Sequence, residues 1–224
     1  MNSFLIFFYI MEGVEFLLLI PFIMKFKILD KGGRWIFYYL ISSAVFASGS
    51  HLIAHISRNN MWFFSPMSLI QFLILTIFFH HVIKNQLLKK IILIVFGLVT
   101  CFAITDYFFL EGPMAYNSYA LSVENLFLLL YSVIYFWELM RDEDLVKQSI
   151  FVNYLPSFWY NSGLFIFHCS NFMLSLAYNF LQHSSFAQFD RGIQNATLSI
   201  TFIGGFAEVV LIYIGLLKAQ KFRS

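Results

Sequence analysis

The sequence predicts an all-α integral membrane protein folded as a bundle of seven transmembrane helices. The chain has 224 residues, of which 60% are hydrophobic and 12% are charged, whereas a soluble domain has about 25% charged residues. Its polar residues are therefore too few to cover a water-facing surface. Thirty phenylalanines support the same class, because their rings transfer favourably into lipid.

A helix needs about 20 mostly apolar residues to cross a bilayer, and seven segments meet that requirement. They are residues 3–24, 35–56, 61–83, 91–110, 117–139, 154–181 and 193–217. The first segment lacks the basic start of a signal peptide and contains Glu12 and Glu15, so we expect a retained helix. The connections are short, which predicts one transmembrane domain over residues 1–224.

The basic residues of the short loops predict the orientation. In a seven-helix topology, twelve of the fourteen Lys and Arg residues fall on one side, and only Arg58 and Arg191 fall on the other. Cytoplasmic loops carry the excess of Lys and Arg. We therefore expect the N-terminus outside and the C-terminus in the cytoplasm.

The sixth segment is apolar almost all round, yet it carries polar groups along its whole length. These are Ser157, Asn161, Ser162, His168, Ser170, Asn171, Ser175 and Asn179. Burying such groups in hydrocarbon is unfavourable, so we expect most of them to face other helices. The aromatic runs at residues 35–39 and 158–160 are typical of interfacial belts.

Ionisable residues inside predicted membrane helices are candidates for a functional site. The predicted pocket is lined by Glu12, Glu15, Glu124, Asn125, Asn161, His168, Asn171 and Glu208. No Lys or Arg falls at the same depth, so we expect the carboxyl groups to be protonated, hydrogen-bonded, or exposed to a water-filled cavity. Such a cavity would bind a small molecule or ion. Alternatively, these side chains form hydrogen bonds between helices and have only a structural role.

A second group of residues, predicted for the outer side of the membrane, suggests a metal site. His51 and His55 are one helical turn apart, the spacing of helical metal sites, and Asp106 or Glu124 would supply a third ligand. Ordinary hydrogen-bonded histidines explain the pattern equally simply. Zinc or another divalent metal is thus the one cofactor that the sequence suggests. Retinal is excluded, because the last helix lacks a Lys near its middle and carries Lys218 at its cytoplasmic end.

Two stretches carry a resemblance to a known family. The sixth segment opens with Pro156, Phe158, Trp159, Asn161, Ser162 and Gly163, and the last ends in Lys218 and Ala219. These stretches, about a quarter of the chain, resemble the last two helices of uncharacterised seven-helix membrane proteins of Bacteroidota. Such proteins are often encoded beside sensor kinases. The resemblance implies a role in sensing at the bacterial inner membrane, without an established activity.

These observations favour a sensory or receptor-like module that binds a small molecule or ion and signals to a cytoplasmic partner. Three other functions stay open: a small transporter or proton/cation conductor, a metal-dependent hydrolase acting on membrane lipid, and an accessory subunit of a larger complex. Membrane lipid is an expected partner in each case. Nucleic acid is not, because a net charge of +2 is too small to favour it.

Overall fold

A computed structural model describes residues 3–57, 59–142, 151–183 and 191–221, and these residues are all-helical, without a strand. The long helices, listed with their bounds, are α1 (Ser3–Lys25), α2 (Lys31–Ser57), α3 (Met61–Val82), α4 (Gln86–Thr105), α5 (Ser118–Met140), α7 (Pro156–His183) and α8 (Arg191–Lys221). Short helical turns are η1 (Phe26–Ile28), the π-helix η2 (Asp106–Leu110) and η3 (Val152–Tyr154). Each predicted segment overlaps one long helix, and the segment predicted at residues 91–110 continues from α4 into η2.

Five stretches are long and apolar enough to cross a membrane, counted over the described residues. They are Lys31–Ser57, Met61–Val82, Gln86–Leu110, Ser118–Met140 and Ser199–Ala219. Apolar side chains also cover much of the outside of the bundle, such as Ile94 and Leu98 of α4, each more than 60% exposed. An exposed apolar surface of this kind suits lipid rather than water.

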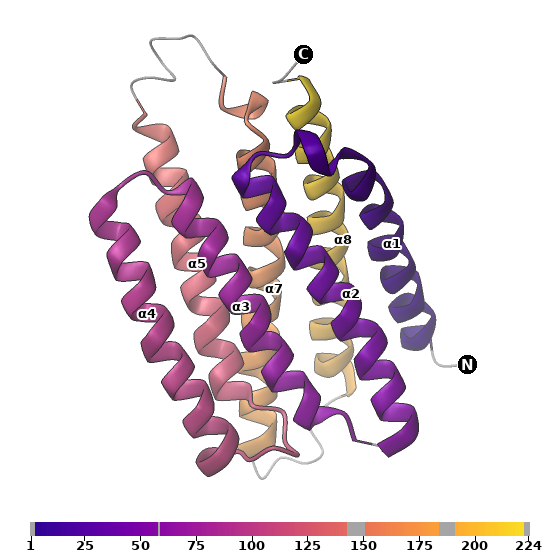
Figure 1. The fold of residues 1–224 in the computed structure, drawn as a ribbon. Coiled ribbons are helices and arrows are strands. Elements are labelled where there is room, and N and C mark those ends of the chain that lie inside the picture. Colours follow the sequence, from indigo (N-terminus) through magenta and orange to yellow (C-terminus); the bar gives the residue numbers. More distant parts are fainter. Residues whose placement is uncertain (1–2, 58, 143–150, 184–190, 222–224) are drawn as a thin grey trace.

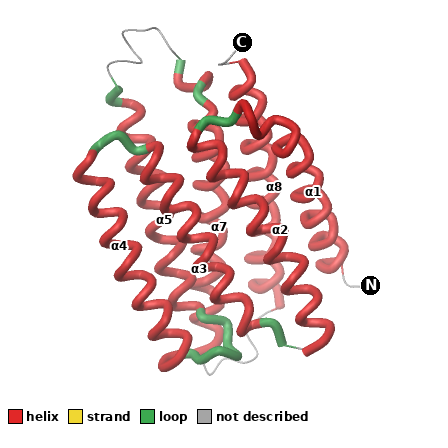
Figure 2. The backbone as a smooth tube through the Cα atoms, in the orientation of Figure 1, coloured by secondary structure: helices red, strands yellow, loops and turns green. Residues whose placement is uncertain are grey.

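The helices form a ring in chain order. Each helix contacts the next, and α8 closes the ring against α1 (Figure 1). Two further contacts cross the ring, between α2 and α7 and between α3 and α5. The described connections lie at the two ends of the bundle (Figure 2). Because α3, α5 and α7 lie next to one another, their polar side chains can meet inside the bundle.

Polar caps extend two helices beyond the predicted apolar segments. The backbone N–H of Gly33 donates to Asp30 Oδ1 at 2.7 Å, so α2 starts at Lys31 rather than at residue 35. Asn85 Oδ1 accepts from the N–H groups of Leu87 and Leu88, so α4 starts at Gln86 rather than at residue 91. Side-chain acceptors satisfy the free N–H groups of a first helical turn.

Glycines allow α7 and α8 to approach closely. A Cβ atom built on Gly215 would lie 2.5 Å from the Tyr160 ring, and one on Gly163 would lie 3.0 Å from the backbone oxygen of Glu208. A Cβ on Gly204 would collide with the Ser170 side chain. Small residues at such positions are typical of membrane helix pairs, whose association depends on close packing. Gly204 therefore allows α8 to pack closely against α7.

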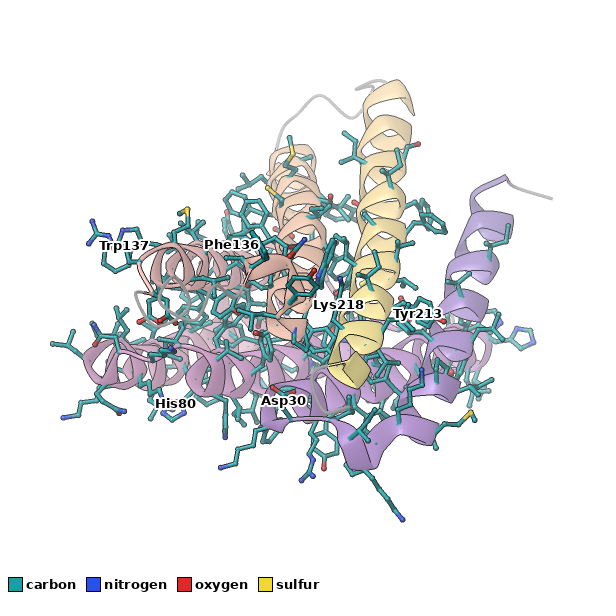
Figure 3. All side chains as sticks on the ribbon, turned by 90° about the horizontal axis from the view of Figure 1, so that it is seen from above. Asp30, His80, Phe136, Trp137, Tyr213 and Lys218 are labelled. Carbon is teal, nitrogen blue, oxygen red and sulfur yellow. The ribbon has the colours of Figure 1, made fainter. Side chains whose placement is uncertain are left out.

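The connections α1–α2 and α3–α4 and the end of α8 lie together, and we call this the basic end (Figure 1). Both carboxylate oxygens of Glu138 accept there from the backbone N–H groups of Lys84 and Asn85, at 2.8 and 3.0 Å. The Lys84 ammonium also pairs with Asp142. Figure 3 looks onto this end, and it shows Trp137 pointing away from the bundle and Lys218 lying toward its centre.

Candidate functional site

A polar cavity of about 130 Å³ lies between α2, α3, α5 and α7, in the half of the bundle opposite the basic end. Its polar lining residues are Ser68, Gln71, Tyr116, Glu124, Asn125, His168, Asn171 and Ser175. Phe46, Phe64, Phe72 and Phe167 contribute to its apolar wall. The cavity thus brings together four of the eight predicted pocket residues, which are Glu124, Asn125, His168 and Asn171.

The His168–Asn125 contact determines how the imidazole meets the cavity. Asn125 Nδ2 donates to the Leu121 carbonyl, which leaves Oδ1 as the acceptor for His168 Nδ1 at 2.8 Å. In a neutral ring, Nδ1 therefore carries the proton and Nε2 carries a lone pair. His168 is 6% exposed, and its Nε2 atom has no hydrogen-bond partner within the described part of the chain. A ligand with an N–H or O–H group would satisfy this acceptor.

Glu124 places a carboxyl group beside the same cavity. Its side chain is 4% exposed and shares a hydrogen bond with Ser68 of α3. Tyr116, in the connection before α5, shares a hydrogen bond with Ser175 of α7, and its ring centroid lies 4.4 Å from that of Tyr178 in a tilted arrangement. Helices α3, α5 and α7 are thereby joined through polar groups around a space that is large enough for a small molecule. A cavity lined by a buried carboxyl group and by a histidine with an unpartnered ring nitrogen favours a ligand that donates hydrogen bonds or carries positive charge.

Other predicted pocket residues lie outside this cavity, in a second cluster between α1, α2 and α8. Ser43 donates to Glu15 Oε2 at 3.0 Å, and the Glu208 carboxyl shares a hydrogen bond with the Tyr39 hydroxyl. Glu208 is 5% exposed, and its Oε1 atom has no partner among the residues described. Glu12 lies near Glu15 on α1. The predicted single pocket is therefore two separate groups of side chains.

Asn161 belongs to neither group. It is fully buried on α7, and its Nδ2 atom donates to the Ser132 carbonyl of α5 at 3.2 Å. This contact is an interhelical hydrogen bond of the kind that holds membrane helices together. Most of the polar side chains along α7 face the bundle: His168, Ser170 and Ser175 are also buried, and Ser157, Ser162 and Asn171 are half-buried. The side chain of Asn179 lies outside the described residues.

The structure does not assemble the predicted metal ligands. His51 and His55 are exposed on α2, whereas Asp106 is fully buried where α4 passes into η2. Asp106 Oδ2 accepts from the backbone N–H of Ala120 at 3.0 Å, which caps the first turn of α5. In the described ranges, no three His, Cys, Asp or Glu side chains are grouped so as to hold a metal ion. Asp106 instead caps the N-terminal end of α5.

Sequence reasoning missed several residues of the two groups. Tyr116 lies in a loop, where no helical periodicity marks it, and Ser68 and Gln71 are ordinary polar residues within an apolar helix. Tyr39 falls in an aromatic run predicted to be an interfacial belt, yet it is 3% exposed, and Tyr160 in the second run is fully buried. Both rings pack in the core, so the prediction of belts is wrong at these two positions.

A second cavity, the apolar groove, adjoins the polar cavity and measures about 210 Å³. It lies between α3, α4, η2 and α5, with Pro66, Ala103, Tyr107 and Ala120 among its lining residues. Pro66 has no N–H, so the carbonyl of Trp62 four residues earlier loses its helical donor. The Tyr107 hydroxyl donates to that carbonyl at 3.3 Å. The π-helix η2 thus replaces a hydrogen bond that proline removes from α3.

Replacing Tyr107 by Phe should lower the thermal stability of the protein, because the Trp62 carbonyl would lose its donor. We expect a loss of about 1 kcal/mol, the usual net value of one hydrogen bond. Heating the purified variant and following its folded fraction by size-exclusion chromatography measures this. Tyr213→Phe is a suitable control, since Tyr213 of α8 is 42% exposed. Equal melting temperatures for Tyr107→Phe and the unmodified protein would contradict the assigned role.

No known protein-family model, curated protein or solved structure matches this chain.

Proposed function

We propose that the protein is a seven-helix membrane sensor that binds a small hydrogen-bond donor or cation in the polar cavity and signals to a cytoplasmic partner. In this proposal all seven helices cross the bacterial inner membrane, with the N-terminus outside. The basic end then faces the cytoplasm, and the polar cavity lies in the outer half of the membrane. This orientation follows the distribution of Lys and Arg.

Two observations carry the proposal: the buried Nε2 atom of His168 has no hydrogen-bond partner in the described part of the chain, and the buried Glu124 side chain lines the same cavity of about 130 Å³. Unpartnered buried polar atoms are rare in native proteins, and each calls for an explanation. A cavity of about 150 Å³ holds a molecule the size of benzene. The geometry therefore fits a ligand of a few heavy atoms that donates to His168 and Glu124.

The basic end supports the signalling part of the proposal. Glu138, Lys84 and Asp142 tie the end of α5 to the α3–α4 connection there. Exposed Trp137 lies beside Arg141, whose guanidinium stacks 4.3 Å from its ring. Tryptophan and arginine are enriched at protein interfaces. The resemblance to proteins encoded beside sensor kinases points to the same kind of partner.

Glu124→Gln tests the proposal, because it preserves the volume of the side chain and removes its ability to ionise and one acceptor oxygen. Methylammonium is the smallest organic probe that carries the expected chemistry. We expect it to raise the melting temperature of the unmodified protein by about 5 °C or more at roughly 100 times its Kd. The rise should vanish in Glu124→Gln, and sodium at equal ionic strength should not produce it.

Glu208→Gln is the matched control, since it neutralises an equally buried carboxyl group outside the polar cavity. We expect the methylammonium effect to survive in this variant. Native mass spectrometry of both proteins, purified gently from their own host, would in addition show whether a small molecule or a protein subunit remains bound. A methylammonium effect that disappears in Glu208→Gln and persists in Glu124→Gln would overturn the proposal.

The cluster between α1, α2 and α8 favours a second candidate function, proton or cation transport. Its specific observation is the pair of Glu15 and Glu208, where Glu208 Oε1 has no partner in the described part of the molecule. Buried carboxyl groups that face one another form proton relays in pumps and transporters. Flux into proteoliposomes that is lost in Glu12→Gln and Glu208→Gln, and kept in Glu124→Gln, would support transport.

A further inference from the structure

The polar cavity and the apolar groove meet at a shared wall. Ser68 of α3 and Leu121 and Glu124 of α5 line both of them. These shared side chains place the two spaces next to each other, so the apolar groove reaches the Glu124 side chain from the side of α4. A molecule that reaches the Glu124 carboxyl from the groove therefore does not need to pass through the loops at the end of the bundle.

The groove differs from the polar cavity in its chemistry. Its wall is mainly apolar, with Leu69 and Ile104 on it, and the small side chains of Ala103 and Ala120 leave room between α4 and α5. At its edge, Ile104 and Phe108 are 48% and 64% exposed on the outside of the bundle. In a membrane, this edge faces the acyl chains rather than water.

Backbone irregularities keep the helices apart around the groove. Pro66 interrupts the hydrogen bonds of α3, and η2 widens the chain after α4 into a π-helix. Such π-helical turns occur frequently at functional sites. The Tyr107–Trp62 contact spans the two irregular segments and holds them at this separation. The apolar groove is thus held open by hydrogen bonding and backbone geometry of the fold itself.

We propose that the ligand is an amphiphile, with a cationic or hydrogen-bond-donating head group in the polar cavity and an apolar chain in the groove, and that it enters sideways from the membrane between α3 and α4. This inference rests on the proposed function, and it adds the class of ligand and its route. The head group meets Glu124 and His168. The chain passes the shared wall at Ser68 and Leu121 and lies against Ala103 and Ala120.

A comparison of n-octylammonium with methylammonium tests the inference, because the two share a head group and differ only in the chain. The protein is placed in lipid nanodiscs, and the Kd of each probe is measured from the shift in melting temperature. Burial of each added methylene strengthens binding, so we expect octylammonium to bind at least tenfold more tightly. Equal affinities would overturn the inference and leave the proposed function standing. No binding of either probe would overturn both.

Ala103→Phe fills the groove and separates specific binding from partition into lipid. We expect it to abolish the tenfold advantage of octylammonium while leaving the Kd of methylammonium unchanged. Leu98→Phe, on the exposed face of the same helix, is the control and should keep the advantage. An advantage that persists in Ala103→Phe would show that the chain binds elsewhere, which overturns the inference.

Photo-crosslinking provides a second measurement that does not depend on the folding of a variant. The probe is an octylammonium with a diazirine at the end of its chain, and the labelled peptides are identified by mass spectrometry. We expect labelling of residues 103–108 and of the α3 segment around Pro66, reduced at least tenfold by excess unlabelled octylammonium. Labelling confined to other helices, or labelling that does not compete, would overturn the assignment of the groove.

Discussion

Gly215→Leu should destabilise the protein by about 3 kcal/mol or more, the upper part of the range for overpacked cores. The new side chain would begin 2.5 Å from the ring of Tyr160, which is fully buried, and 3.1 Å from the backbone oxygen of Pro156. The ring has no free space to move into, so α7 and α8 must separate. Thermal unfolding in detergent, read from the loss of the monodisperse peak, measures the change.

Gly97→Leu is the matched control within the same chain. Gly97 also lies inside a helix, α4, but a Cβ atom there meets nothing within 4 Å. Leu favours helix over Gly by roughly 0.8 kcal/mol, so we expect unchanged or slightly higher stability. If both variants melted at the same temperature, the close approach of α7 and α8 would not be what these glycines provide.

Asp106→Leu should have the second largest effect. It removes the carboxylate that accepts from Ala120 N and leaves a buried N–H at the start of α5 without a partner. Such a loss costs about 2 kcal/mol, from the unmade hydrogen bond and from the lost interaction with the helix dipole. Because α5 carries Glu124 and Asn125 six and seven positions beyond Ser118, we expect weaker methylammonium binding as well.

Asp106→Asn distinguishes this capping role from a role that requires charge. The amide keeps an acceptor oxygen, so we expect it to retain more than half of the lost stability and all of the methylammonium binding. The same melting assay, with and without the probe, gives both quantities. A variant as unstable as Asp106→Leu would instead mean that the negative charge itself holds this end of the bundle.

The number and placement of the helices could be predicted from the sequence because apolar length decides them. The starts of α2 and α4 could not, because Asp30 and Asn85 begin these helices outside the apolar window. Tyr39 and Tyr160 show a second limit. An aromatic residue near a predicted membrane surface can face either lipid or the bundle, and only the packing of neighbouring helices determines which.

The sequence could predict which types of residue line the candidate site. It could not predict which of these residues lie together. Glu15 and Glu208 lie near one another on α1 and α8, while Glu124 of α5 and His168 of α7 line a different space, the polar cavity. All four are placed at similar depth by their positions in the sequence, so depth alone suggests one pocket. Which helices are neighbours depends on side-chain packing along their whole length. His51 and Asp106 were assigned to one metal site for the same reason.

Helix α5 runs unbroken from the polar cavity to the basic end. Glu124 lies near its N-terminal end and Glu138 near its C-terminal end. Glu138 lies fourteen positions after Glu124, a distance of about 21 Å along the helix. Glu138 accepts hydrogen bonds from two backbone N–H groups of the α3–α4 connection. This connection is therefore bound directly to the end of α5. A small rotation of α5 around an occupied cavity would therefore displace Lys84 and Asp142 at the opposite surface, with no intervening hinge to absorb it.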